Sequence, residues 1–119
     1  MKINIKRLHS KYPEELIKLG RWLLPEIKEW DDIEYHHLNL FFDQNNIFLN
    51  IQKLIEGDGW MYRILYPIST EEGDVRAIFN SMSHISREDA LIKGLDTCFR
   101  FFNNPKFLEK MTHEEISKL

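Results

Sequence analysis

A helical pattern of apolar residues occupies the stretch from Pro13 to Ile27. Pro13 suits the first helical position, because its missing N–H has no partner there, and Pro25 should kink or end the helix. Apolar side chains between them recur at spacings of three and four, which predicts one apolar helical face. The residues on that face are Leu16, Leu19, Leu23 and Ile27.

The pattern changes to period two in the middle of the chain, which predicts antiparallel strands joined by polar turns. Pro67 should end one of these strands or mark an edge, because proline cannot donate to a strand ladder. Residues 33–42 fit a strand or a helix, and this choice decides the number of strands. The expected strands cover residues 37–42, 47–55, 60–66 and 75–79, and the turns between them cover residues 43–46, 57–59 and 70–74.

A second helix should begin at Ser86, whose side chain is placed to cap it, with Asp89 completing a capping box. Ala90 and Gly94 lie one turn apart, and such small residues allow a helix backbone to approach a sheet closely. Residues 103–105 should end this helix. Its apolar face consists of Leu91, Leu95, Cys98 and Phe102.

These elements follow the order helix, three or four strands, helix and short helix. Strands grouped between helices are typical of an α+β fold rather than a parallel βαβ fold. We expect one domain over residues 1–119, with an N-terminal helix, an antiparallel sheet of three to four strands, and a long C-terminal helix packed on one sheet face. Thr112 opens a second capping box, so a short tail helix should lie within residues 106–119.

Charge is distributed unevenly near the N-terminal end. Residues 1–11 carry four cations and no acid, and the alternation of Ile3 and Ile5 there predicts a basic arm or an edge strand. Residues 26–34 carry five acids against one lysine, so the two stretches could attract each other or contact different partners. The four cations are Lys2, Lys6, Arg7 and Lys11.

Composition excludes several classes of protein. With 119 residues, 43% of them apolar, the chain is long enough to bury a core and is not disordered. Its 16 Lys and Arg residues against 19 Asp and Glu residues give a net charge of −3, which argues against a nonspecific nucleic-acid coat. The single cysteine excludes an internal disulfide. No apolar run has the length of a membrane span or signal peptide, so we expect a cytoplasmic protein.

Three features could carry chemistry, and each has a simpler structural explanation. His36 and His37 are adjacent, so their side chains diverge on a strand or a helix, which is poor geometry for one metal. Cys98 lies on an apolar helix face and fits a buried hydrophobe better than a nucleophile. Asp31 and Asp32 fit no EF-hand or hydrolase spacing. Phosphate-binding loops and nucleophile motifs are also missing, so we expect no metal, no cofactor and no catalytic site.

An aromatic stripe follows one face of the strand expected over residues 60–66. Trp60, Tyr62 and Tyr66 belong to the core if helices cover this face, and could grip a peptide or stack on bases if it is exposed. We favour the core, because an exposed stripe of this size is unusual on a monomer. Arg63 points to the opposite face, which is then the natural interaction surface.

Two resemblances accompany these motifs. The segments 60–64 (WMYRI) and 86–91 (SREDAL) resemble small proteins of bacteriophages, prophages and mobile elements, especially those of the Bacteroidetes type, and this resemblance implies no activity. The order of elements from Pro13 to Phe102 resembles that of double-stranded-RNA-binding domains. In that family a serine and a basic cluster open the last helix, whereas here Ser86 and Arg87 are followed by two acids.

We therefore expect a non-enzymatic α+β binding module of bacterial or phage origin, which binds a protein partner or a second copy of itself, for example through a sheet edge. The alternative is a weak nucleic-acid-binding protein that uses the basic N-terminus and one sheet face. A small-molecule enzyme is the third hypothesis and would need a deep pocket with convergent polar groups. The candidate interaction surface consists of Lys2, Lys6, Arg7, Lys11, Trp30, Asp31, Asp32, Arg63 and Arg76.

Overall fold

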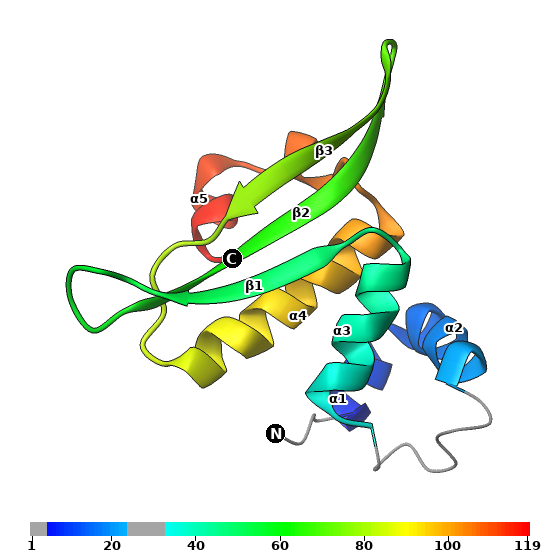
Figure 1. The fold of residues 1–119 in the computed structure, drawn as a ribbon, viewed down its shortest axis with the longest axis horizontal. Helices are drawn as coiled ribbons and strands as arrows, with labels where there is room; N and C mark the ends of the chain where they lie inside the picture. The colour runs from blue at the N-terminus through cyan, green and yellow to red at the C-terminus, as the bar shows by residue number, and fades with distance from the viewer. Residues whose placement is uncertain (1–4, 24–32) are drawn as a thin grey trace.

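The computed structural model describes residues 5–23 and 33–119, in which helices at both ends flank one antiparallel sheet (Figure 1). The elements in chain order are α1 (Ile5–Lys11), α2 (Pro13–Leu23), α3 (Tyr35–Gln44), β1 (Phe48–Lys53), β2 (Trp60–Thr70), β3 (Gly73–Asn80), α4 (Arg87–Asn103), the 3-10 helix η2 (Phe107–Lys110) and α5 (His113–Ser117). The strand order is β1-β2-β3, so β2 is central. The α+β class, the long helix on the sheet and the tail helix are confirmed, and the sheet of the described residues has three strands.

The stretch that fitted a strand or a helix is helix α3. The strand expected over residues 37–42 is therefore wrong, because the apolar side chains there are buried at helical spacing rather than at period two. The helix begins after Glu34, whose backbone N–H donates to His37 Nδ1 at 2.9 Å. The buried side chains of α3 are Leu38, Phe41 and Phe42.

The N-terminal part of the chain is helical where the structure describes it. Residues 5–11 form α1, so the expected extended arm or edge strand is wrong for them, and residues 1–4 lie outside the described residues. Leu8 is buried, and its carbonyl accepts from the Tyr12 N–H at 2.7 Å. Helix α2 begins at Pro13 as expected and buries Leu16 and Leu19. The break expected at Pro25 lies outside the described residues, as do Ile27 and the side chain of Leu23.

Strand β2 continues through Pro67 to Thr70 instead of ending there. The pairing with β1 stops at Phe48 and Leu65, whereas the pairing with β3 continues to Gly73. Pro67 therefore lies where β2 has only β3 beside it among the described residues. The expectation that Pro67 marks an edge is confirmed. Proline has no backbone N–H, and the central strand tolerates it because no third strand of the described residues needs a donor at this position.

Helix α4 packs closely on one face of the sheet. Ser86 caps it by accepting from the Asp89 N–H at 3.1 Å. A Cβ added at Gly94 would lie 2.8 Å from Leu49 Cδ1 and 3.2 Å from Tyr62 Cγ, so only a glycine allows this approach without a shift. The small residue expected at this helix–sheet contact is thus confirmed.

The aromatic stripe belongs to the core. Tyr62 and Tyr66 are buried and Trp60 is half-buried. Tyr66 stacks on Phe101 of α4 with ring centroids 3.7 Å apart. In the described ranges no helix is long and apolar enough to cross a membrane.

Candidate functional site

Exposure alternates along the strands, and it separates a helix-covered face from an open face of the sheet. On β2 the buried residues Tyr62, Ile64 and Tyr66 alternate with the half-buried Arg63 and Leu65. Because successive side chains of a strand point to opposite faces, Arg63 and Leu65 lie on the face away from α4. This open face is the surface on which sequence analysis placed Arg63.

An apolar row crosses all three strands on the open face. Leu65 of β2 pairs with Phe48 of β1 on one side and with Ile78 of β3 on the other. Ile78 is 60% exposed and Leu65 is half-buried. Side chains directly opposite each other in an antiparallel sheet contact one another, so these three form one continuous strip. Phe48, Leu65 and Ile78 are called the apolar row below.

The two arginines predicted for this face flank the apolar row on opposite sides. Arg63 lies two residues before Leu65 on β2 and so on the same face, and its Nε donates to Asn80 Oδ1 at 2.8 Å. Arg76 lies two residues before Ile78 on β3, and its guanidinium carbon is 5.1 Å from the centre of the Phe48 ring. One arginine therefore lies on each long side of the apolar row. Arg63 is held by Asn80 and Arg76 by the Phe48 ring, both on the same face.

The basic residues of helix α1 lie at a different place. Arg7 contacts Asp96 of α4 through two hydrogen bonds of 3.0 Å, and Lys11 Nζ is 3.7 Å from the same carboxylate. Asp96 belongs to the helix that covers the other face of the sheet. The structure thus brings Arg63 and Arg76 together on the open face and keeps Arg7 and Lys11 apart from them.

The other members of the predicted surface lie outside the described residues or have no described side chain. Lys2 lies outside the described residues, and Lys6 belongs to α1 without a described side chain. Residues 26–32 of the acidic stretch also lie outside them, including its predicted members Trp30, Asp31 and Asp32, whereas Glu34 precedes α3.

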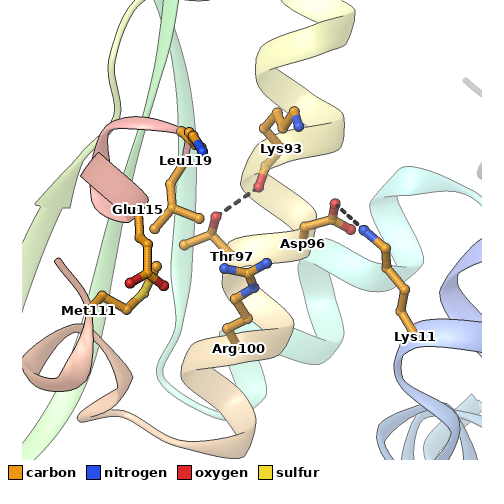
Figure 2. Close-up of a pocket in the computed structure, with 9 residues that line it drawn as sticks. Lys11, Lys93, Asp96, Thr97, Arg100, Met111, Glu115 and Leu119 are labelled. Carbon is orange, nitrogen blue, oxygen red and sulfur yellow. Dashed lines mark hydrogen bonds and ion pairs between the residues drawn. The ribbon is translucent and has the colours of Figure 1, made fainter. Parts of the chain in front are cut away.

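A polar pocket beside α4 is a second feature, and sequence reasoning missed it (Figure 2). It has a volume of about 280 Å³ and lies where α4, the end of α1 and the tail helix α5 meet. Its signal in the sequence is a polar stripe at spacings of three and four along α4, beside the apolar face of that helix. That stripe consists of Lys93, Asp96, Thr97 and Arg100.

The side chains that could be reactive are buried in the core or hydrogen-bonded within the fold. Cys98 is fully buried, and burial raises the pKa of its thiol well above the usual value, which is the opposite of an activated nucleophile. Burial also raises the pKa of the Tyr62 hydroxyl, which lies 2.8 Å from Thr97 Oγ1 and donates to the Leu119 backbone oxygen. His37 is used in the cap of α3. Among the described residues, no three His, Cys, Asp or Glu side chains are arranged to hold a metal ion.

Comparison of the chain with models of protein families found no match, and comparisons with curated proteins and with solved structures found none either.

Proposed function

We propose that the chain is a non-enzymatic interaction module whose open sheet face binds a protein partner with an apolar centre and an acidic rim. The observation that carries the proposal is the apolar row flanked by Arg63 and Arg76. The resemblance of segments 60–64 and 86–91 to phage and prophage proteins supports a bacterial or phage origin, and we propose a cytoplasmic location.

The chemistry of the face favours a protein surface as its ligand. Burial of the apolar row against a partner contributes roughly 25 cal/mol per Å² of apolar surface removed from water. Arginine is enriched in the residues that dominate protein interfaces, and Arg63 and Arg76 are positioned to meet carboxylates at the rim. Each guanidinium is already held by a neighbour, Asn80 or Phe48, so less side-chain entropy is lost on binding.

The same charges argue against a second copy of this chain on the open face. A two-fold axis along the strands would bring Arg63 of one copy opposite Arg63 of the other. An axis along the apolar row would instead bring Arg63 opposite the Arg76 side of the other copy. Both arrangements oppose like charges, which is unfavourable in an interface.

Nucleic acid is the alternative ligand, and two observations weigh against it. Phe48 is the aromatic residue on the described part of the open face, and Arg76 lies over its ring, which leaves no bare aromatic platform for base stacking. Arg7 and Lys11, which this alternative requires, contact Asp96 on the helical side. On the open face, contacts with a phosphate backbone would have to rest on Arg63 and Arg76 among the described residues.

The experiment compares two variants of β3 in pull-downs from lysate of the source organism. Ile78→Glu places a carboxylate in the apolar row, whereas Val75→Glu places one on the same strand at a residue of the opposite face. Both positions are exposed, so both variants should fold. We expect the wild type and Val75→Glu to capture one protein in stoichiometric amount, and Ile78→Glu to lose it. The purified partner should bind the purified wild type.

The outcomes separate the hypotheses. A partner retained equally by Ile78→Glu, or the lack of any partner that depends on Ile78, would overturn the proposal. Nucleic acid that elutes at low salt, and is lost when Arg63 and Arg76 are both changed to Gln, would establish the alternative instead. A dimer in light scattering that Ile78→Glu dissociates would show that the partner is a second copy.

A further inference from the structure

We infer that the pocket between α4 and α5 binds a small oxyanion of the phosphate class. This inference does not depend on the proposed function, because the pocket lies on the helical side of the sheet. It rests on cationic residues of α1, of α4 and of the segment after α5, which line one cavity. The charged residues that line it are Lys11, Lys93, Arg100 and Lys118, against Asp96 and Glu115.

The two carboxylates of the pocket are already engaged. Asp96 accepts both hydrogen bonds of Arg7 and lies 3.7 Å from the Lys11 ammonium. Glu115 Oε1 belongs to the capping box of α5, where it accepts from the Thr112 hydroxyl at 3.1 Å and from the Thr112 N–H at 3.4 Å. The partners of Glu115 in the cap are neutral, so its negative charge still acts on the pocket, but the lining cations outnumber the lining carboxylates by four to two.

Three cations remain for a ligand. In the described part of the chain, Lys93, Arg100 and Lys118 have no carboxylate oxygen within 4.0 Å of their charged nitrogens. Figure 2 shows the Arg100 guanidinium pointing to the middle of the pocket, with Glu115 on one side and Asp96 on the other. The lining therefore carries an excess of positive charge, and a bound anion would lower the repulsion between these cations.

Arg100 is the central residue of the site. It is half-buried, whereas Lys93 and Lys118 are exposed at the rim. It also lies beside the Tyr12 hydroxyl, where it opposes the increase in the tyrosine pKa that burial and Asp96 cause. A planar guanidinium offers paired N–H donors that match two oxygens of a phosphoryl group, and the lysines add point charges from the sides.

The size of the pocket limits the ligand. A volume of about 280 Å³ is at the lower end of small-molecule sites, which span roughly 300–1,000 Å³. Phosphate or pyrophosphate fits inside it, whereas a nucleotide would have to leave its base outside. We therefore assign the site to a phosphoryl group, either as free phosphate or pyrophosphate or as the phosphate of a small ester.

The test is isothermal titration calorimetry of the whole chain at low salt with pyrophosphate, inorganic phosphate, sulfate and adenosine monophosphate. We expect pyrophosphate to bind, Arg100→Gln to weaken binding by about tenfold or more, and Lys118→Gln to weaken it by a smaller factor. Lys53→Gln, on the exposed end of β1, removes the same charge away from the pocket and should change the affinity less than about twofold. Tighter binding of adenosine monophosphate than of phosphate would identify an ester as the ligand.

Two results would overturn the inference. One is the lack of binding of every anion at millimolar concentration. The other is equal affinity of the wild type, Arg100→Gln and Lys118→Gln for the anion, which would mean that the heat signal comes from a general effect of ionic strength and not from this pocket. If Arg100→Gln does not fold, amide shifts of the wild type decide the question: pyrophosphate should move residues 93–100 and 115–119, and a response confined to other residues would contradict the site.

Discussion

The two faces of strand β2 are built from adjacent residues and meet opposite surroundings. Tyr62, Ile64 and Tyr66 are buried under α4, whereas Arg63 and Leu65 between them reach the open face. Both faces of the strand carry apolar side chains, such as Ile64 on one and Leu65 on the other. One face belongs to the core and the other stays open because α4 covers only one of them.

The polar groups on the two faces also have different partners. On the covered face the Tyr62 hydroxyl is satisfied internally by Thr97 and Leu119. On the open face Arg63 and Arg76 hold their charges at the rim with neutral neighbours. A buried polar group must be satisfied within the protein, whereas an exposed arginine remains available to a partner.

The largest difference between the faces should appear when neighbouring residues of β2 are truncated. Ile64→Ala removes a fully buried side chain and should lower the free energy of unfolding by about 2–5 kcal/mol. Leu65→Ala, on the open face, should cost about 1 kcal/mol or less. Urea denaturation of both variants measures the gap, and equal losses would show that the open face is also a core.

The close approach of α4 to the covered face should resist any added volume. Gly94→Val places a branched side chain against Leu49 and Tyr62, and overpacking of this kind costs about 1–3 kcal/mol. Lys93→Val, one residue earlier and exposed, reports the helix propensity of valine alone. Thermal unfolding should rank Gly94→Val well below Lys93→Val, and a reversed order would contradict the packing described here.

The buried hydroxyl on the covered face should make stability depend on alkaline pH. Burial raises the pKa of Tyr62, so above pH ~10 the unfolded chain releases a proton that the folded chain keeps, and the free energy of unfolding falls as pH rises. Tyr62→Phe should cost about 1–2 kcal/mol at pH 7, because the Leu119 oxygen loses a donor, and should lose stability less steeply between pH 9 and 11. Urea denaturation at several pH values tests this, and identical slopes for the two proteins would contradict it.

The smallest effect on stability belongs to the proposed binding face. Ile78→Glu should change the free energy of unfolding by about 0.5 kcal/mol or less, because its side chain is 60% exposed, while partner binding is lost. Phe79→Glu, the next residue, points to the core and should unfold the protein. Circular dichroism melts of both variants check this contrast, and a large loss for Ile78→Glu would mean that its effect on binding is indirect.

Much of the fold followed from local patterns in the chain. The proline at the start of α2, the serine cap of α4 and the capping box at Thr112 predicted where those helices begin. The strand alternation predicted β1, β2 and β3 and placed Arg63 opposite Tyr62. These signals are short-range, so residues within one or two turns suffice to specify them.

The failures have a common physical cause. The apolar run in residues 37–42 fits both the helical and the strand period. Contacts with α4 decide for the helix: the ring centroids of Phe42 and Phe99 are 4.9 Å apart, and those of Phe41 and Phe102 are 5.2 Å apart. The basic N-terminal stretch was expected to be an extended arm or an edge strand, and residues 5–11 of it are helical. This helix places the Arg7 guanidinium against the carboxylate of Asp96, 89 residues later in the chain, and no local pattern indicates that contact.

The sequence by itself determined the two faces of the sheet, because side-chain direction alternates with every residue of a strand. It also determined where the main helices begin, because caps act within one helical turn. Only the tertiary structure decided which face α4 covers, that Phe48, Leu65 and Ile78 form one row, and that Lys93, Arg100 and Lys118 surround one pocket. Each of these depends on contacts between segments distant in the chain, and strand register and helix packing bring those segments together only in the folded molecule.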